Sequence, residues 1–250
     1  HDNASLLLVK EAIEQYGFIG VKIYPPNGFY PYGNQTINNS TGQARPDLTK
    51  LDQKLETLFG WCADNHIPVM AHTAQSMGSD KAADQFGGPD GWRALLNKFS
   101  NQQNVPIINA GHFGGDEGDN NWTSQFGDMM KTSSGKSVYA DVGYWDELEH
   151  CQNKDCLPIQ RIKQALTTSN NIAKQRIMYG TDWLMSSKEA GWPDYPFKLQ
   201  QQLKDILPLD RFFYENALDC FGLGKSGAQR EKIIQRFKSQ STSLPAWLKS

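Results

Sequence analysis

Residues 68–73 read PVMAHT, a short apolar run that leads into a histidine. Runs of the same kind lie at 18–24 (FIGVKIY), 105–112 (VPIINAGH), 137–142 (SVYADV) and 176–182 (RIMYGTD). They are apolar along most of their length and lack the strict alternation of a strand with one exposed face. The sequence therefore predicts five strands that are covered on both faces, as in a parallel sheet.

Segments with helical periodicity lie between and around these runs. Apolar residues recur at i, i+3 and i+4 spacing over 48–62, 92–99 and 159–166, and further helices are expected at 5–15 and 228–237. Strands that alternate with amphipathic helices are typical of an α/β fold, either a doubly wound sheet or a barrel. No GxGxxG-type phosphate loop follows any of the runs, which weakens the nucleotide-binding alternative.

The composition is that of an ordinary globular chain. It has 250 residues, 38% of them hydrophobic and 21% charged, with a formal net charge of −2. We expect one domain over residues 1–250. The sequence contains no block of basic residues that would bind nucleic acid or an anionic membrane surface. No apolar run approaches the roughly 20 residues that a membrane span needs. A small molecule is the expected ligand.

The four cysteines are Cys62, Cys151, Cys156 and Cys220, and none forms a Cys-x2-Cys pair. We expect free thiols in a reducing, cytoplasmic compartment. A disulfide between Cys151 and Cys156 in an exported protein is the alternative.

Polar side chains occur within or at the ends of the predicted strands. They are Lys22, His72, His112, Asp141 and Asp182. In a parallel barrel the carboxyl ends of the strands converge on the face that carries the active site. Two imidazoles and a carboxylate at that face suit Zn²⁺ or another divalent ion such as Mn²⁺. The pattern predicts His72, His112 and Asp182 as metal ligands.

Each of these residues also has a simpler interpretation. A single histidine at a strand end is usually a hydrogen-bonded core residue, although His72 and His112 occur at the same level of two strands. Asp182 could cap the following helix. Lys22 could be a carboxylated metal bridge, a clamp for a substrate carboxylate or a side chain that reaches solvent. Asp141 is expected to be structural.

Five segments together resemble the amidohydrolase superfamily, especially its amidohydrolase-related branch of metal hydrolases, lactonases and decarboxylases. Residues 17–25, 67–73, 107–115 and 176–183 resemble the fourth, fifth, sixth and eighth strands of that (β/α)8 barrel, and 215–223 resembles its closing helix. The resemblance implies a TIM-type barrel of which this chain supplies about the last five βα units.

The resemblance also implies roles for single residues. His72 would be a metal ligand, His112 a metal or substrate histidine, and Asp182 a metal ligand that shuttles the proton. Tyr24 stands where the branch usually has histidine. The His-x-His pair of the family's first strand does not occur in this sequence. We therefore expect about three strand–helix units before residue 1, or a partner chain, as in a homo-oligomer, that completes the fold.

The leading functional expectation is a metal-dependent hydrolase of C–N or C–O bonds in a small organic molecule. Metal-bound hydroxide would be the nucleophile, and Asp182 and His112 the catalytic residues. Lys22, Tyr24 and Trp183 are expected to bind the substrate. The alternatives are a metal-dependent decarboxylase of a small (aromatic) carboxylic acid and a degenerate barrel that serves as a non-catalytic binding module.

Two segments after strands are long enough to shape a site. Residues 25–46 form an aromatic, proline-rich segment that either covers the site or packs on the next helix. Residues 114–119 (GGDEGD) either contact a polar substrate or form a solvated acidic turn.

Overall fold

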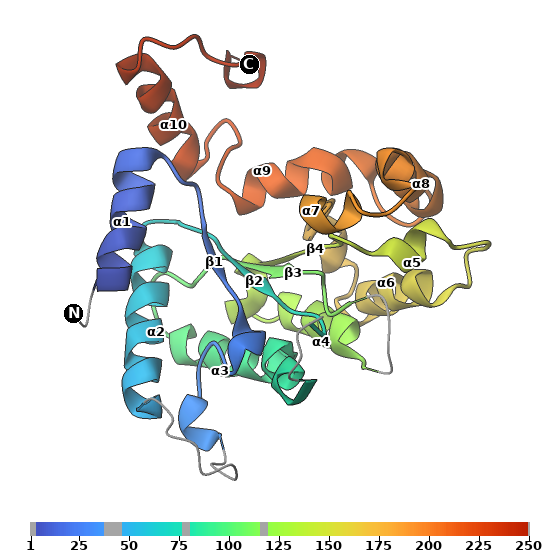
Figure 1. Ribbon diagram of the computed structural model, residues 1–250, viewed down its shortest axis with the longest axis horizontal. Coiled ribbons are helices and arrows are strands. Elements are labelled where there is room, and N and C mark those ends of the chain that lie inside the picture. Colours follow the sequence, from blue (N-terminus) through green and yellow to red (C-terminus); the bar gives the residue numbers. More distant parts are fainter. Residues whose placement is uncertain (1–3, 38–46, 77–80, 116–119, 250) are drawn as a thin grey trace.

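The structure of the chain is a computed structural model (Figure 1). The residues that the structure describes are 4–37, 47–76, 81–115 and 120–249.

The five predicted strands form one parallel sheet in the order β1-β2-β3-β4-β5. Their bounds are β1 Val21–Ile23, β2 Val69–His72, β3 Ile108–Gly111, β4 Val138–Asp141 and β5 Ile177–Met178. A doubly wound sheet reverses its strand order at a switch point. The described strands show no such reversal, so the arrangement is that of five consecutive βα units of a barrel.

Helices on one side of the sheet cover its apolar face. They are α2 (Leu48–Asp64), α3 (Pro89–Phe99), α4 (Trp122–Met130) and α6 (Leu157–Thr168), while α1 (Ala4–Tyr16) precedes β1 (Figure 1). The helical periodicity predicted α1, α2, α3 and α6 with boundaries within a few residues. α4 had no predicted counterpart.

The two faces of the sheet differ because successive side chains of a strand point in opposite directions. Val69, Ala71, Ile108 and Ala110 belong to the main hydrophobic core. The residues between them in the register, such as Met70 and Asn109, face the other way. On that second face Tyr139 and Met178 pack against Cys220 in a smaller cluster.

The segment after β5 packs against both clusters, because Cys220 belongs to the smaller cluster and Leu199 and Leu203 belong to the main core. It contains α7 (Trp183–Ser186), α8 (Tyr195–Leu203), a π-helix (Arg211–Glu215), α9 (Asn216–Cys220), α10 (Ala228–Ser239) and α11 (Ala246–Lys249). α10 returns to the start of the sheet, where the Gln229 side chain donates to the carbonyl of His66 at 2.9 Å and Arg236 donates to that of Gln15 (Figure 1). His66 precedes β2 and therefore lies on the face opposite the carboxyl ends of the strands.

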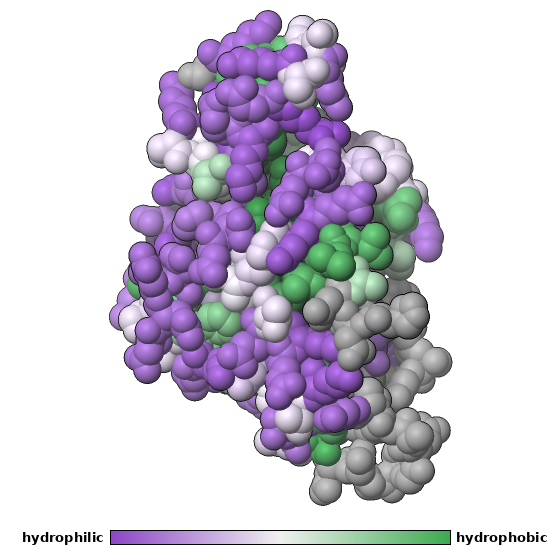
Figure 2. Space-filling view, turned by 90° about the vertical axis from the view of Figure 1, so that its left-hand side faces the viewer, coloured by the Kyte–Doolittle hydropathy of each residue, from purple (hydrophilic) through white to green (hydrophobic). Residues whose placement is uncertain are grey.

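Hydrophobic side chains are exposed on the side of the molecule formed by α1. Leu7 and Leu8 are 63% and 65% exposed, and Phe18 beyond the helix is 61% exposed. Figure 2 looks onto this side and shows hydrophobic surface near its middle. The structure describes no element that covers these side chains.

The expectation of four free thiols was wrong for two of them. Cys151 and Cys156 form a disulfide, with Cα atoms 5.8 Å apart. Cys151 follows the short helix α5 (Asp146–Glu149) and Cys156 is the N-cap of α6, so the turn between the two helices brings them together. Cys62 and Cys220 are buried free thiols. Disulfides persist mainly in oxidising compartments, so a cytoplasmic location stays a prediction. None of the described helices is long and apolar enough to span a membrane.

Part of the proline-rich segment packs on α2. Asn34 is fully buried, and its side chain donates to Asp52 of α2 at 2.7 Å. The packing alternative is thus observed for the turn Asn34–Thr36, whereas the turn Pro25–Asn27 contacts the segment Lys81–Gly87. Residues 38–46, and 116–119 of the acidic turn, lie outside the described residues.

Candidate functional site

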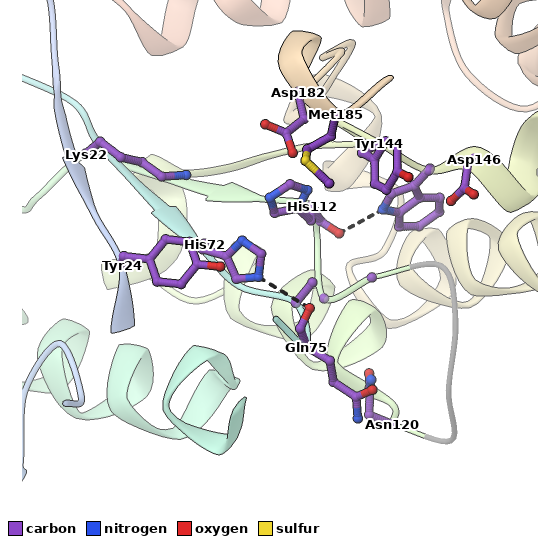
Figure 3. Close-up of a pocket in the computed structure, with 14 residues that line it drawn as sticks. Lys22, Tyr24, His72, Gln75, His112, Asn120, Tyr144, Asp146, Asp182 and Met185 are labelled. Atoms are coloured by element: carbon purple, nitrogen blue, oxygen red, sulfur yellow. Dashed lines mark hydrogen bonds between the residues drawn. The ribbon is translucent and has the colours of Figure 1, made fainter. Parts of the chain in front are cut away.

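A pocket of about 500 Å³ opens at the carboxyl ends of the strands. Lys22 and Tyr24 line it from the β1 side, His72 from the end of β2, His112 from the turn after β3 and Asp182 from the turn after β5 (Figure 3). These five predicted site residues are therefore brought together. They come from four strands because parallel strands all end at the same edge.

The sixth predicted site residue, Trp183, does not line this pocket. Its side chain is 62% exposed and packs edge-on against Trp192, with ring centroids 6.4 Å apart. Trp183 begins α7, directly after the turn that carries Asp182. Its neighbour two residues on, Met185, lines the pocket instead.

His112 is held through its backbone and its ring. Its N–H lies 3.3 Å from Asp141 Oδ1, and its carbonyl accepts a 2.8 Å hydrogen bond from the Trp145 indole. Its Nδ1 lies 2.7 Å from the carbonyl oxygen of Gly143. Because a carbonyl only accepts, Nδ1 carries the proton, which leaves the Nε2 lone pair of the neutral ring for a ligand. The backbone of His112 is left-handed, with φ 68°.

Asp141 lies behind His112, at the end of β4, and is only 5% exposed. Its Oδ2 accepts from the Asn109 side chain at 2.9 Å, and its Oδ1 accepts from the N–H of Gly143 at 2.9 Å as well as from His112. A buried carboxylate with these partners fixes the turn on which His112 depends. This agrees with the structural role expected for Asp141.

His72 is packed between two rings. The Tyr24 ring stacks on it at a centroid distance of 4.6 Å, and the His112 ring lies 4.5 Å away at 60° (Figure 3). Burial, and then the neighbouring His112, lower the pKa of His72 to about 4. His72 is therefore neutral near pH 7, which is the state that binds a metal. Its Nε2 faces the carbonyl of Gln75 at 3.4 Å, so Nδ1 is the ring nitrogen left for a ligand.

Lys22 is the one cationic side chain among the described residues that line the pocket. Burial lowers its pKa, while the charges of Asp141 and Asp182 act in the opposite direction. Within the described part of the chain its ammonium makes no hydrogen bond and no ion pair. It is therefore available to a ligand.

Asp182 occupies the N-cap position of α7 in a left-handed conformation, with φ 45° and ψ 52°. Aspartate tolerates this conformation better than most residues. Its side chain makes no capping hydrogen bond, although its backbone carbonyl accepts from Met185 at 2.7 Å. The capping alternative therefore does not account for the carboxylate, which is exposed at the pocket.

The turn after β4 supplies lining residues that the sequence patterns did not single out as site residues. Tyr144 and Asp146 line the pocket beside the buried Trp145. The Tyr144 hydroxyl donates to Glu189 at 2.8 Å, and this bond is the main cause that raises the pKa of Tyr144 to about 12. The sequence signal that could have identified Tyr144 and Asp146 was their position directly after the apolar run 137–142. Gln75 after β2 carries the same signal.

The donor atoms fit a divalent metal in part. The two imidazoles are in contact and have the borderline-soft nitrogen donors that Zn²⁺ and similar ions prefer. In the described segments, however, no three His, Cys, Asp or Glu side chains are grouped closely enough to hold an ion. His72 and His112 are thus suitable ligands, but the described residues do not complete a ligand set.

Comparison with known proteins places the chain in a family. The amidohydrolase family model matches residues 2–223, which include the five described strands and the described residues that line the pocket. No curated protein and no solved structure matched the chain significantly. Members of this family are generally metal-dependent hydrolases or related decarboxylases and share a TIM-barrel fold, in keeping with the parallel sheet described above. The chain belongs to the amidohydrolase family.

Proposed function

We propose that the protein is a metal-dependent hydrolase of C–N or C–O bonds in a small organic substrate. The observation that carries this proposal is the contact between the His72 and His112 rings, each with one ring nitrogen left for a ligand, in a pocket that also holds the Asp182 carboxylate. The pocket volume of about 500 Å³ is that of a small-molecule site.

The two walls of the pocket have different tasks in this proposal. A divalent ion, zinc or manganese, held by His72 and His112 would polarise the substrate carbonyl and acidify a water molecule. Asp182 takes the proton from the attacking water and returns it to the leaving group, because its carboxylate is exposed at the pocket and makes no capping bond. Lys22 and Tyr24 bind the substrate from the β1 side.

The proposal is tested with a panel of small amides, esters and lactones. The chain is purified with any upstream sequence of its gene, and turnover is compared between the wild type, Asp182→Asn and a surface control, Asp90→Asn. We expect Asp182→Asn to lower kcat by about a thousandfold or more, with an unchanged circular dichroism spectrum, and Asp90→Asn to be active. Full activity of Asp182→Asn would contradict the role of Asp182. Carbon dioxide release from carboxylic acids, without hydrolysis of any panel member, would replace the hydrolase by a decarboxylase.

A further inference from the structure

The disulfide between Cys151 and Cys156 joins two elements that both support the pocket. Cys151 follows α5 and Cys156 is the N-cap of α6, and the two helices lie side by side (Figure 1). Both cysteines are half-buried, and residues 152–155 between them are exposed. The disulfide therefore lies where a small dithiol from solvent can reach it while the core stays folded.

One of the two connections leads from the disulfide through α5 to His112. α5 begins at Asp146, which lines the pocket together with Tyr144 (Figure 3). Trp145 stands between them in the chain, and its indole N–H donates to the carbonyl oxygen of His112 at 2.8 Å. A displacement of α5 therefore acts on this carbonyl.

The other connection leads from the disulfide through α6 to the same atom. Arg161 of α6 is buried, and its guanidinium donates to the carbonyls of Gly115 at 2.6 Å and Asn120 at 3.2 Å, two residues that line the pocket. The backbone N–H of Gly115 donates to the carbonyl oxygen of His112 at 2.7 Å. This oxygen thus accepts one hydrogen bond from each of the two supports that the disulfide joins.

The disulfide is poorly placed to stabilise the fold as a whole. A disulfide stabilises mainly by restricting the unfolded chain, an effect that grows with the length of the loop it closes, and here the two cysteines are only five residues apart. Hydrogen bonds also hold this loop. The Gln202 side chain donates to the Cys151 carbonyl at 2.8 Å, and Lys163 donates to the carbonyl of Lys154 at 2.9 Å. The two thiols therefore stay close after reduction and can be oxidised again.

We infer that the Cys151–Cys156 disulfide is a reversible redox switch that sets the position of His112 on the β3–β4 side of the pocket. In the oxidised state the disulfide holds α5 and α6 together, and both hydrogen bonds to the His112 carbonyl are kept. In the reduced state α5 moves independently of α6, and the hydrogen bond from Trp145 is weakened. The inference concerns the geometry of the pocket and does not depend on the reaction that the pocket catalyses.

The switch is operated by thiol–disulfide exchange with a dithiol. A thiolate of the dithiol attacks the sulfur of Cys151, the bond between the two protein sulfurs breaks, and Cys156 leaves as a thiolate. The second thiol of the dithiol then displaces Cys151, so two electrons and two protons pass to the protein and the dithiol becomes a disulfide. Cys156 is the leaving group because the N-terminus of α6, a helix of 12 residues, stabilises a thiolate.

Reduction of the folded protein tests the chemistry. The protein is treated with an excess of dithiothreitol, alkylated with iodoacetamide and digested for mass spectrometry. We expect Cys151 and Cys156 to be alkylated, whereas Cys62 and Cys220 stay unmodified because they are buried and burial raises the pKa of their thiols. At pH 7 Cys156 in the Cys151→Ser variant should react about threefold faster than Cys151 in the Cys156→Ser variant. Reduction that occurs only together with alkylation of Cys62, which marks unfolding, overturns the switch. Equal rates overturn the choice of Cys156 as the leaving group.

The coupling to the pocket is measured on the indole ¹H–¹⁵N signal of Trp145, assigned with Trp145→Phe. On reduction we expect the signal to shift and its N–H to exchange with solvent about tenfold faster, because the hydrogen bond to His112 is weakened. The signal should return on reoxidation, and in Cys151→Ser/Cys156→Ser it should stay at the reduced position with or without dithiothreitol. The indole of Trp92, buried in α3, is the control and should not shift. If the double variant does not fold, the reduced wild type decides. A Trp145 signal that reduction leaves unchanged overturns the inference.

Discussion

The two walls of the pocket are built in different ways. On the β3–β4 side His112 is tied by its N–H, its carbonyl and its ring to Asp141, Trp145 and Gly143. On the β1 side Lys22 has no hydrogen bond or ion pair to any residue that the structure describes. A group that takes part in chemistry benefits from being fixed in advance, whereas a group that binds substrate must keep its bonding capacity free. From this difference we propose that the β3–β4 side carries the chemistry and that the β1 side binds the substrate.

The largest effect on stability is expected from Asp141→Ala, on the β3–β4 side of the pocket where His112 is fixed. The substitution removes the acceptor of the Asn109, His112 and Gly143 donors in a buried place, so we expect the free energy of unfolding to fall by about 3 kcal/mol. Urea unfolding measures this loss, and the exposed Asp90→Asn is the control. A loss below about 0.5 kcal/mol would show that the wall does not depend on Asp141.

A smaller effect is expected from Tyr195→Phe. The Tyr195 hydroxyl of α8 donates to the Val142 carbonyl at 2.7 Å and accepts from the backbone N–H of Trp145 at 3.1 Å, so it fixes the turn that presents Gly143 to His112. We expect a loss of about 1 kcal/mol in the free energy of unfolding. Long-range ¹H–¹⁵N spectra of labelled histidine should also show His112 with a smaller share of the Nδ1–H tautomer. An unchanged share of the Nδ1–H tautomer would show that Tyr195 of α8 does not influence the ring of His112.

The strands and most of the helices could be predicted because apolar runs and helical periodicity are local patterns. The placement of His72, His112 and Asp182 in one pocket could also be predicted, because their positions at the ends of apolar runs are visible in the sequence. The supports of the site are not local. Trp145 and Tyr195 are 50 residues apart, and their contact depends on how α8 packs beside the β4–α5 turn.

Two further features depended on three-dimensional detail. The Cys151–Cys156 disulfide requires the turn between α5 and α6 to bring two Cα atoms to 5.8 Å, and five residues of spacing do not specify that geometry. Trp183 was predicted in the site because it adjoins Asp182. The left-handed backbone of Asp182 and the start of α7 place the indole outside the pocket lining.

The pH dependence of the free energy of unfolding should report the lowered pKa of His72. Its pKa of about 4 in the folded protein lies below the ordinary value of about 6.5 in the unfolded chain. Between these values the unfolded chain binds a proton that the folded protein does not, so stability falls as the pH decreases from 6.5 to 4. In chelator-treated protein we expect the urea midpoint to fall more over this range for the wild type than for His72→Gln. Parallel curves would contradict the lowered pKa.

The smallest effect on stability is expected from a substitution of Lys22, on the β1 side of the pocket. Lys22→Met removes a cation that has no bonded partner among the described residues, so the free energy of unfolding should change by no more than about 0.5 kcal/mol. Calorimetric melting measures this directly, with Lys198→Met as the comparison, because Lys198 pairs with the buried Glu149 at 2.5 Å. A large loss for Lys22→Met would mean that Lys22 is a structural residue and that the contrast between the walls is wrong.

The most direct test of the central claim is the metal content of the purified protein, with any upstream sequence of its gene, by plasma mass spectrometry. The account predicts about one or two zinc or manganese ions per chain in the wild type and in Asp90→Asn, and their loss in the His72→Ala/His112→Ala double variant. A wild type that binds no ion after incubation with zinc or manganese, or a double variant that binds as much metal as the wild type, would contradict the assignment of these two histidines to a metal site.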